Sequence, residues 1–114
     1  MAAVYVSNIV INSGVNFSQV FFLDNTDSNS SIDLTNYNVK SQMRKHSGSS
    51  NYVNFDCNIE DPSEGKISIG LSTSITSSLR PGRYLYDIVI TDPYTFIKTR
   101  VVEGMVLVRE GVTR

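Results

Sequence analysis

The chain has a single cysteine and no tryptophan in 114 residues. Cys57 therefore cannot form a disulfide within the chain, which is typical of proteins assembled in a reducing cytoplasm. Alternation with Val53, Phe55 and Ile59 places Cys57 on an apolar face, so we expect it to be a small buried hydrophobic residue. A reactive thiol would need a cation or a base nearby.

The chain also has no excess of charge of one sign and no long apolar run. The formal net charge is −1, with acidic and basic residues spread along the chain, and no basic block predicts nucleic-acid binding. No apolar stretch approaches the ~18 residues of a membrane span. Met1–Tyr5 lacks the basic start and apolar run of a signal peptide. We expect one domain over residues 1–114, not secreted, with neither a membrane nor a nucleic-acid partner.

Histidine is almost absent, which limits the possible chemistry. His46 is the only one, and it lies beside Lys45 at the edge of a Ser/Gly loop. A Ser-His-Asp site needs its base held in place by a carboxylate, and nothing near His46 indicates one. One cysteine and one histidine fall short of four zinc ligands. We expect a solvated loop histidine.

The carboxylates give no stronger signal. Asp24–Asp27 superficially resembles a calcium loop, but Asn29 and Thr35 stand where such a loop requires glycine and glutamate. Asp87 and Asp92 are five residues apart on an expected strand, so their side chains face opposite sides and cannot act as one acid–base pair. We therefore expect no catalytic residue, no metal, no cofactor and no enzymatic activity.

Two-residue alternation of apolar and polar side chains is what the chain has in abundance. It predicts strands with one face on a core. In Arg83–Thr91 the apolar residues of one phase are Tyr84, Tyr86, Ile88 and Ile90. Similar alternation predicts strands in Phe17–Leu23, Tyr37–Lys45 and Lys66–Leu71.

Loops and one helical turn separate these strands. Ser72–Leu79 alone has helical spacing, and Pro81-Gly82 ends it, so we expect a single turn that crosses between two sheets. About seven strands with turns every 8–12 residues predict an all-β, immunoglobulin-like antiparallel β-sandwich. Without tryptophan and a cysteine pair, antibody-type architecture is not supported. The expected loops are Asp24–Ser31, Ser47–Asn51, Asp61–Gly65 and Asp92–Tyr94.

The last expected strand contains apolar residues of both phases. A regular strand cannot bury both sets on one face. A bulge near Glu103-Gly104 would reset the phase, because one extra residue turns every later side chain to the opposite face. The alternative is a stretch buried on both faces, one of them by a neighbouring subunit. The two sets are Ile97, Thr99 and Val101, then Val102, Val106 and Val108.

Two tyrosines are candidate contacts for a partner. Tyr94 lies in the turn of the last hairpin, and Tyr52 lies beside the Ser/Gly loop. Rigid aromatic side chains in loops make good interaction hot spots. Tyr84 and Tyr86 alternate with isoleucines, so we expect them in the core or at its margin.

Ser31–Arg44 reads S-I-D-L-T-N-Y-N-V-K-S-Q-M-R and leads into a strand that ends in basic residues. This segment resembles the I-D-L-T-G-Y-type strand entry of small β domains in tailed-bacteriophage virion proteins. Asn36 stands where glycine is common in these domains, and we expect no appended domain after Arg114. The resemblance continues, in order, through Gly65–Ser72, Leu79–Ile88, Val101–Val108 and Val112–Arg114.

This resemblance implies a structural or attachment protein of a tailed-phage virion. Such a module docks in multiple copies to other virion proteins at the tail, baseplate or fibre, after assembly in the host bacterial cytoplasm. A capsid decoration (cement) protein on the phage head is one alternative. The other is a carbohydrate-binding module that recognises host glycans through Tyr52, Tyr94 and the polar loops.

Overall fold

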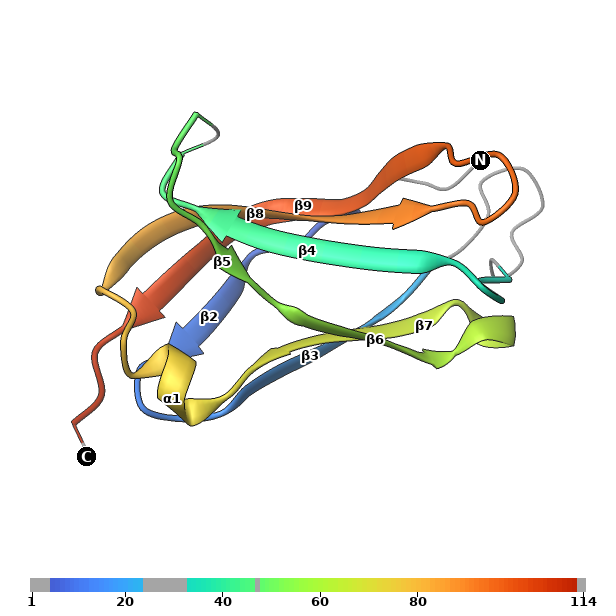
Figure 1. Ribbon diagram of the computed structural model, residues 1–114. Helices are drawn as coiled ribbons and strands as arrows, with labels where there is room; N and C mark the ends of the chain where they lie inside the picture. Colours follow the sequence, from blue (N-terminus) through green and yellow to red (C-terminus); the bar gives the residue numbers. More distant parts are fainter. Residues whose placement is uncertain (1–4, 24–32, 47, 113–114) are drawn as a thin grey trace.

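The computed structural model describes residues 5–23, 33–46 and 48–112. In these ranges the chain forms two β-sheets that face each other (Figure 1). In the larger sheet, β1 (Tyr5–Val6) and β2 (Ile9–Asn12) pair with β9 (Lys98–Arg109), and β8 (Gly82–Thr91), β4 (Asn38–Arg44) and β5 (Val53–Asn54) follow in that order. The smaller sheet has the order β3 (Phe17–Phe22), β7 (Lys66–Leu71) and β6 (Asp56–Asp61).

The nine strand segments reduce to seven runs of chain. β1 and β2 form one strand interrupted at Ser7-Asn8, since both pair with β9 in the same direction. Phe55 alone separates β5 from β6, and there the chain passes from the larger sheet to the smaller one. The prediction of a sandwich of about seven strands is confirmed. The pairing of β1 and β2 with β9 is parallel, an exception to the otherwise antiparallel ladders.

The connections follow the turn signals of the sequence. The predicted helical turn is α1 (Thr73–Thr76), which links β7 in the smaller sheet to β8 in the larger one. A 3₁₀ turn, η1 (Pro62–Glu64), joins β6 to β7 and ends at Gly65, whose φ of 64° suits glycine. The predicted Asp24–Ser31 loop lies outside the described residues.

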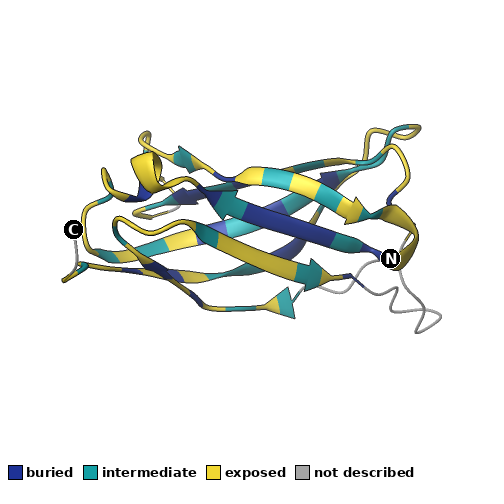
Figure 2. Ribbon diagram, turned by 90° about the horizontal axis from the view of Figure 1, so that it is seen from below, coloured by how far each residue is buried: buried dark blue, intermediate teal, exposed yellow. Residues whose placement is uncertain are grey.

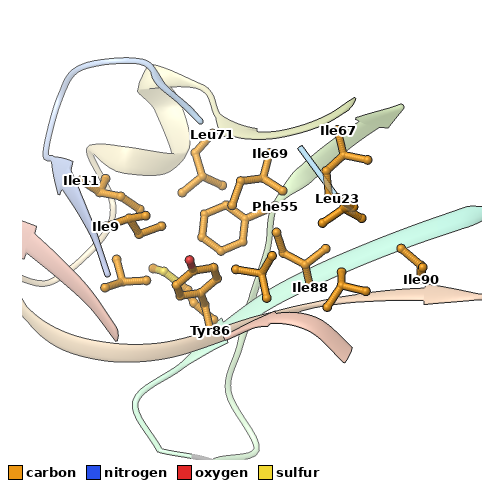
Figure 3. Close-up of a cluster of buried hydrophobic side chains, with 14 of the residues drawn as sticks. Ile9, Ile11, Leu23, Phe55, Ile67, Ile69, Leu71, Tyr86, Ile88 and Ile90 are labelled. Carbon is orange, nitrogen blue, oxygen red and sulfur yellow. The ribbon is translucent and has the colours of Figure 1, made fainter. Parts of the chain in front are cut away.

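The core lies between the two sheets and is almost entirely aliphatic (Figure 3). On β8 the predicted inner face is correct, since Tyr86, Ile88 and Ile90 are buried and Tyr84 is half-buried. Phe55 packs at the point where the chain changes sheets, with its ring centroid 6.0 Å from Phe17 and 6.2 Å from Tyr86. Tilted aromatic contacts at such distances add to the burial of apolar area.

The last strand does change phase, but the predicted position of the bulge is wrong. Ile88 on β8 pairs with Val102, whereas the next residue, Val89, pairs with Arg100. Val101 is therefore the extra residue, upstream of the expected Glu103-Gly104. Both Val101 and Val102 are fully buried, because a bulge turns two consecutive side chains toward the same face.

Gly104 has a different role from the one expected. It pairs regularly with Tyr86, but a Cβ at this position would collide with the carbonyl oxygen of Ser7. The Asn8 carboxamide oxygen accepts a 3.0 Å hydrogen bond from the Met105 N–H just beyond it. The missing side chain at Gly104 therefore lets the break between β1 and β2 lie close against β9.

Candidate docking surfaces

The structure places Tyr52 and Tyr94 on two separate surfaces. Tyr52 directly precedes β5, and its ring lies under the guanidinium of Arg44, the last residue of β4. Tyr94 lies just beyond β8, whose Thr91 pairs with Asn38, the first residue of β4. The two tyrosines thus flank opposite ends of a seven-residue strand, roughly 20 Å apart at the usual rise per residue. They cannot line one binding site together.

Asp92 organises the turn that joins β8 to β9. Its Oδ1 accepts hydrogen bonds from the N–H of Tyr94 at 2.8 Å and from the N–H of Thr95 at 3.2 Å. The backbone of Asp92 also closes the turn, accepting from Phe96 N–H and donating to the Ile97 carbonyl, both at 3.0 Å. Because the donors favour the charged carboxylate, the Tyr94 N–H foremost, the pKa of Asp92 is lowered.

This turn is also anchored to Tyr37, the residue that directly precedes β4. The hydroxyl of Tyr37 donates to the Asp92 Oδ2 at 3.2 Å. Burial is the main reason that the pKa of Tyr37 is raised, and the bond to Asp92 adds to it. Side chain and backbone of Asp92 together hold the hairpin end in one conformation.

Three apolar side chains project from this fixed turn. Tyr94 is 81% exposed, Phe96 76% and Ile97 62%. Phe96 has a φ of 60°, the left-handed region that a bulky residue enters only at a cost in strain. We call Tyr94, Phe96 and Ile97 the hairpin tip. A turn that holds large apolar residues in water, one of them strained, is typical of a contact surface.

A second apolar area covers the outer face of the larger sheet. Leu85 on β8 lies directly opposite Met105 on β9, and Val6 on β1 lies nearby, all of them exposed. They line a shallow groove of about 730 Å³. Val10 and Leu107 pair on the same face and extend the apolar area along β2 and β9. We call Val6, Leu85, Met105, Leu107 and Val10 the outer-face patch.

Charged side chains border this patch on one side. Arg100 contacts Asp87 at 3.2 Å and Glu103 at 3.6 Å, and all three line the groove. Such exposed pairs contribute little to stability, but they frame an apolar surface with both signs of charge. Arg44 lines the groove as well and stacks on Tyr52 at 4.7 Å. Tyr52 is therefore a border residue of the outer-face patch.

Of the residues considered for catalysis, Asp87 borders the outer-face groove and Asp92 caps the hairpin turn, so these two carboxylates belong to different surfaces. His46 is exposed in the β4–β5 connection, as expected. Cys57 is half-buried against the core, and burial raises the pKa of its thiol, the opposite of what activates a nucleophile. Among the described residues no group of three or more His, Cys, Asp or Glu side chains could hold a metal ion. Asp24–Asp27 lies outside that part of the chain.

Sequence reasoning identified Tyr52 and Tyr94 but missed most of both surfaces. Ile97 was counted among the apolar residues of the last strand, but it precedes β9 and is exposed, and Phe96 was not singled out. Leu85 and Met105 were not identified from the sequence as surface contacts. Each alternates with the buried residues of its strand and therefore takes an outward position. Apolar residues at outward positions of a strand are the signal that could have found them.

No family model and no curated protein matches the chain. Among solved structures, a crystal structure of InlP from Listeria monocytogenes is similar over 90% of this chain, with a TM-score of 0.51 and 15% identity. The likeness covers 26% of the InlP chain, about a quarter of its length. The NK cell receptor NKp44, described as a triggering partner in natural cytotoxicity, is 15% identical over 92% of this chain and 97% of its own, with a TM-score of 0.47.

Similarity at 15% identity shows the fold alone. Together with the two-sheet topology, it defines the class of the protein as an immunoglobulin-like β-sandwich. None of these comparisons bears on the resemblance to phage virion domains, which stays a prediction. No helix in the described ranges has the length and apolar character needed to cross a membrane.

Proposed function

We propose that this sandwich is a non-enzymatic structural or attachment protein of a tailed-phage virion. It docks in multiple copies to other virion proteins at the tail, baseplate or fibre. Its place in a virion rests on the sequence resemblance in Ser31–Arg44 and the later segments. The mode of action rests on the surfaces described above. Capsid decoration on the head remains the alternative location, and the same docking chemistry serves both.

The observation that carries the proposal is the hairpin tip. Tyr94, Phe96 and Ile97 are all more than half exposed on a turn that Asp92 and Tyr37 hold in place. A surface of this kind loses little conformational entropy on binding, because its backbone is already ordered. The partner that fits it is a protein with an apolar pocket.

The outer-face patch supports a second contact of the same kind. Leu85, Met105 and Val6 offer an apolar centre, and the Arg100–Asp87 pair lies at its border. An apolar centre with a polar rim is the usual anatomy of a protein–protein interface. A module embedded among several neighbours needs more than one such surface.

The test is incorporation into particles. Phage particles produced with the wild-type chain or with Phe96→Ser are purified and quantified by mass spectrometry of tryptic peptides. The matched control is Val15→Ser, which removes an apolar side chain of comparable exposure, 55%, on the turn between β2 and β3. We expect Phe96→Ser to be depleted from particles at least about tenfold, the effect of losing one strong anchor. Wild-type chain missing from purified particles would contradict the proposal.

Carbohydrate binding is tested with the same purified protein. A glycan array that gives a signal abolished by Tyr94→Ala or Tyr52→Ala would favour the carbohydrate-binding module over protein docking. We expect no such signal.

A further inference from the structure

We propose that β3 is an edge at which a second copy of this chain docks, so that the smaller sheets of two molecules join into one continuous sheet. The inference concerns self-association. It goes beyond docking to other virion proteins and does not depend on it.

One side of β3 is unpaired within the described residues. β3 pairs only with β7 there. The N–H of Leu23, just after β3, donates to the carbonyl of Gly65 on the β7 side. Backbone groups alternate in direction along an antiparallel strand, so those of Ser18, Val20 and Phe22 point to the open edge. The Val20 carbonyl accepts only a long, 3.5 Å bond from the carboxamide of Gln19.

The other outermost strands of the two sheets are shorter than β3 or carry charges. β1 and β5 have two residues each and β2 has four, and short edges offer few pairing groups. β6 has three acidic residues, Asp56, Glu60 and Asp61, and a register shift between Ile59 and Asp61. β3 has six residues, F-S-Q-V-F-F, without a charge, a proline or a bulge. It is the edge with the features of a pairing site.

The side chains of β3 point to the same conclusion. On its outer face Val20 is 40% exposed and Phe22 59%. Figure 2 shows the smaller sheet with buried β7 between two largely exposed strands. Lys66 on β7 lies over the Phe22 ring at 5.8 Å, which covers one aromatic face but leaves the edge free. An apolar strand edge of this kind gains from a further strand.

A second copy is the occupant that these features fit. Antiparallel pairing about a two-fold axis at Val20 places Val20 opposite its counterpart and Ser18 opposite Phe22. Each of these pairs can exchange two main-chain hydrogen bonds. No charge meets a like charge, because β3 has none, whereas β6 pairing with itself would bring acidic side chains together. Two-fold symmetry then buries the same surface on both molecules.

Val20 and Asn58 provide a matched test. Both pair with Ser68 on β7, one on each side, so they lie at the same level on opposite edges of the smaller sheet. Sedimentation velocity is measured on the full chain over a concentration series for the wild type, Val20→Lys and Asn58→Lys. A lysine at 20 would face its own copy across the two-fold axis. We expect the wild type and Asn58→Lys to form dimers, and Val20→Lys to remain monomeric with an unchanged circular dichroism spectrum.

A second variant separates backbone pairing from charge. The N–H of Val20 points away from β7, so Val20→Pro removes no bond inside the molecule but takes away a donor at the centre of the proposed pair. We expect it to fold and to lose the dimer. The proposal is overturned by a wild type that stays monomeric up to about 1 mM, a concentration that detects even weak association. It is equally overturned if folded Val20→Lys or Val20→Pro dimerises as the wild type does, or if Asn58→Lys loses the dimer too.

Discussion

The hydroxyl of Tyr86 donates a 2.6 Å hydrogen bond to the carbonyl oxygen of Ser7 and so ties the middle of β8 to the break between β1 and β2. Gly104 lies opposite Tyr86 on the intervening strand, β9. Its lack of a side chain leaves room for the Ser7 carbonyl. One backbone group therefore depends on two residues far away in the sequence, and this relationship fixes the N-terminal strand on the larger sheet.

Tyr86→Phe should lower the free energy of unfolding by about 1–2 kcal/mol, because it leaves the Ser7 carbonyl without its bond while keeping the ring. Tyr84→Phe is the matched control. The Tyr84 hydroxyl donates to the Arg80 carbonyl at 2.8 Å in an exposed position, where water replaces it. Urea unfolding of both variants measures the difference. Equal losses of unfolding free energy would mean that the hydrogen bond to Ser7 contributes no more than the exposed one to Arg80.

Gly104→Ala should destabilise the fold by about 1–3 kcal/mol, since the added methyl group pushes the Ser7 carbonyl away from β9. At Gly48 a Cβ would meet only the His46 ring at ordinary contact distance, 3.7 Å. Gly48→Ala is therefore expected to change stability by no more than about 0.5 kcal/mol. Thermal unfolding followed by circular dichroism compares the two. A Gly104→Ala protein as stable as the wild type would contradict the close approach.

Ile88→Ala should cost about 2–5 kcal/mol, because Ile88 is fully buried between the sheets and truncation leaves a cavity. Its neighbour Val89 points to the outer face and is half-exposed. Val89→Ala should therefore cost less, at most about 1 kcal/mol. The comparison by denaturant unfolding tests the inner face of β8. A larger loss of stability in Val89→Ala than in Ile88→Ala would show that the opposite face of β8 is the buried one.

The inner face of β8 shows how much the sequence could predict. Strict alternation of Tyr84, Tyr86, Ile88 and Ile90 was enough to assign both the strand and its buried side, because the period of side chains in a strand is two. The turn at Asp61–Gly65 and the helical turn at α1 were equally accessible from Pro, Gly and spacing. Local patterns of this kind predict the structure correctly because the conformation that each favours is also the one that the tertiary structure requires.

Features that depend on distant partners could not be read from local patterns. The phase change in the last strand was visible, but its position at Val101 is set by pairing with Ile88 and Val89. The parallel pairing of β1 and β2 with β9 joins the two ends of the chain. The hairpin tip and the outer-face patch consist of apolar residues that a search for core positions passes over. Their exposure is decided by tertiary packing, which no local pattern encodes.

The conformation of the hairpin tip should depend on pH through Asp92. The pKa of Asp92 is lowered below its usual value of 3.8 in the folded state. A group of this kind stabilises the fold above its unfolded pKa, and the contribution is lost as the pH falls through the folded pKa. We expect the amide NMR signals of Tyr94 and Thr95 to shift together below about pH 4, and Asp92→Asn to remove this titration. Signals that stay unchanged down to about pH 2 would contradict the capping role of Asp92.

Phe96→Gly should separate stability from docking. Glycine adopts a φ of 60° without strain, so the variant should be as stable as the wild type or more stable by up to about 1 kcal/mol, although glycine gains entropy in the unfolded chain. It should still lose docking, because the aromatic anchor is gone. Thermal unfolding and incorporation into particles are measured on the same protein. A large loss of stability would show that Phe96 serves the fold rather than a partner.

Cryo-electron microscopy of the phage particle that contains this chain tests the docking account most directly. We expect the sandwich in several copies around the tail, baseplate or fibre, with Tyr94, Phe96 and Ile97 seated in an apolar pocket of a neighbouring protein. Copies spread over the head would identify capsid decoration as the location of the protein and would leave the docking role unchanged. Particles without density for this fold, or a bound sandwich whose hairpin tip and outer-face patch both face solvent, would contradict the account.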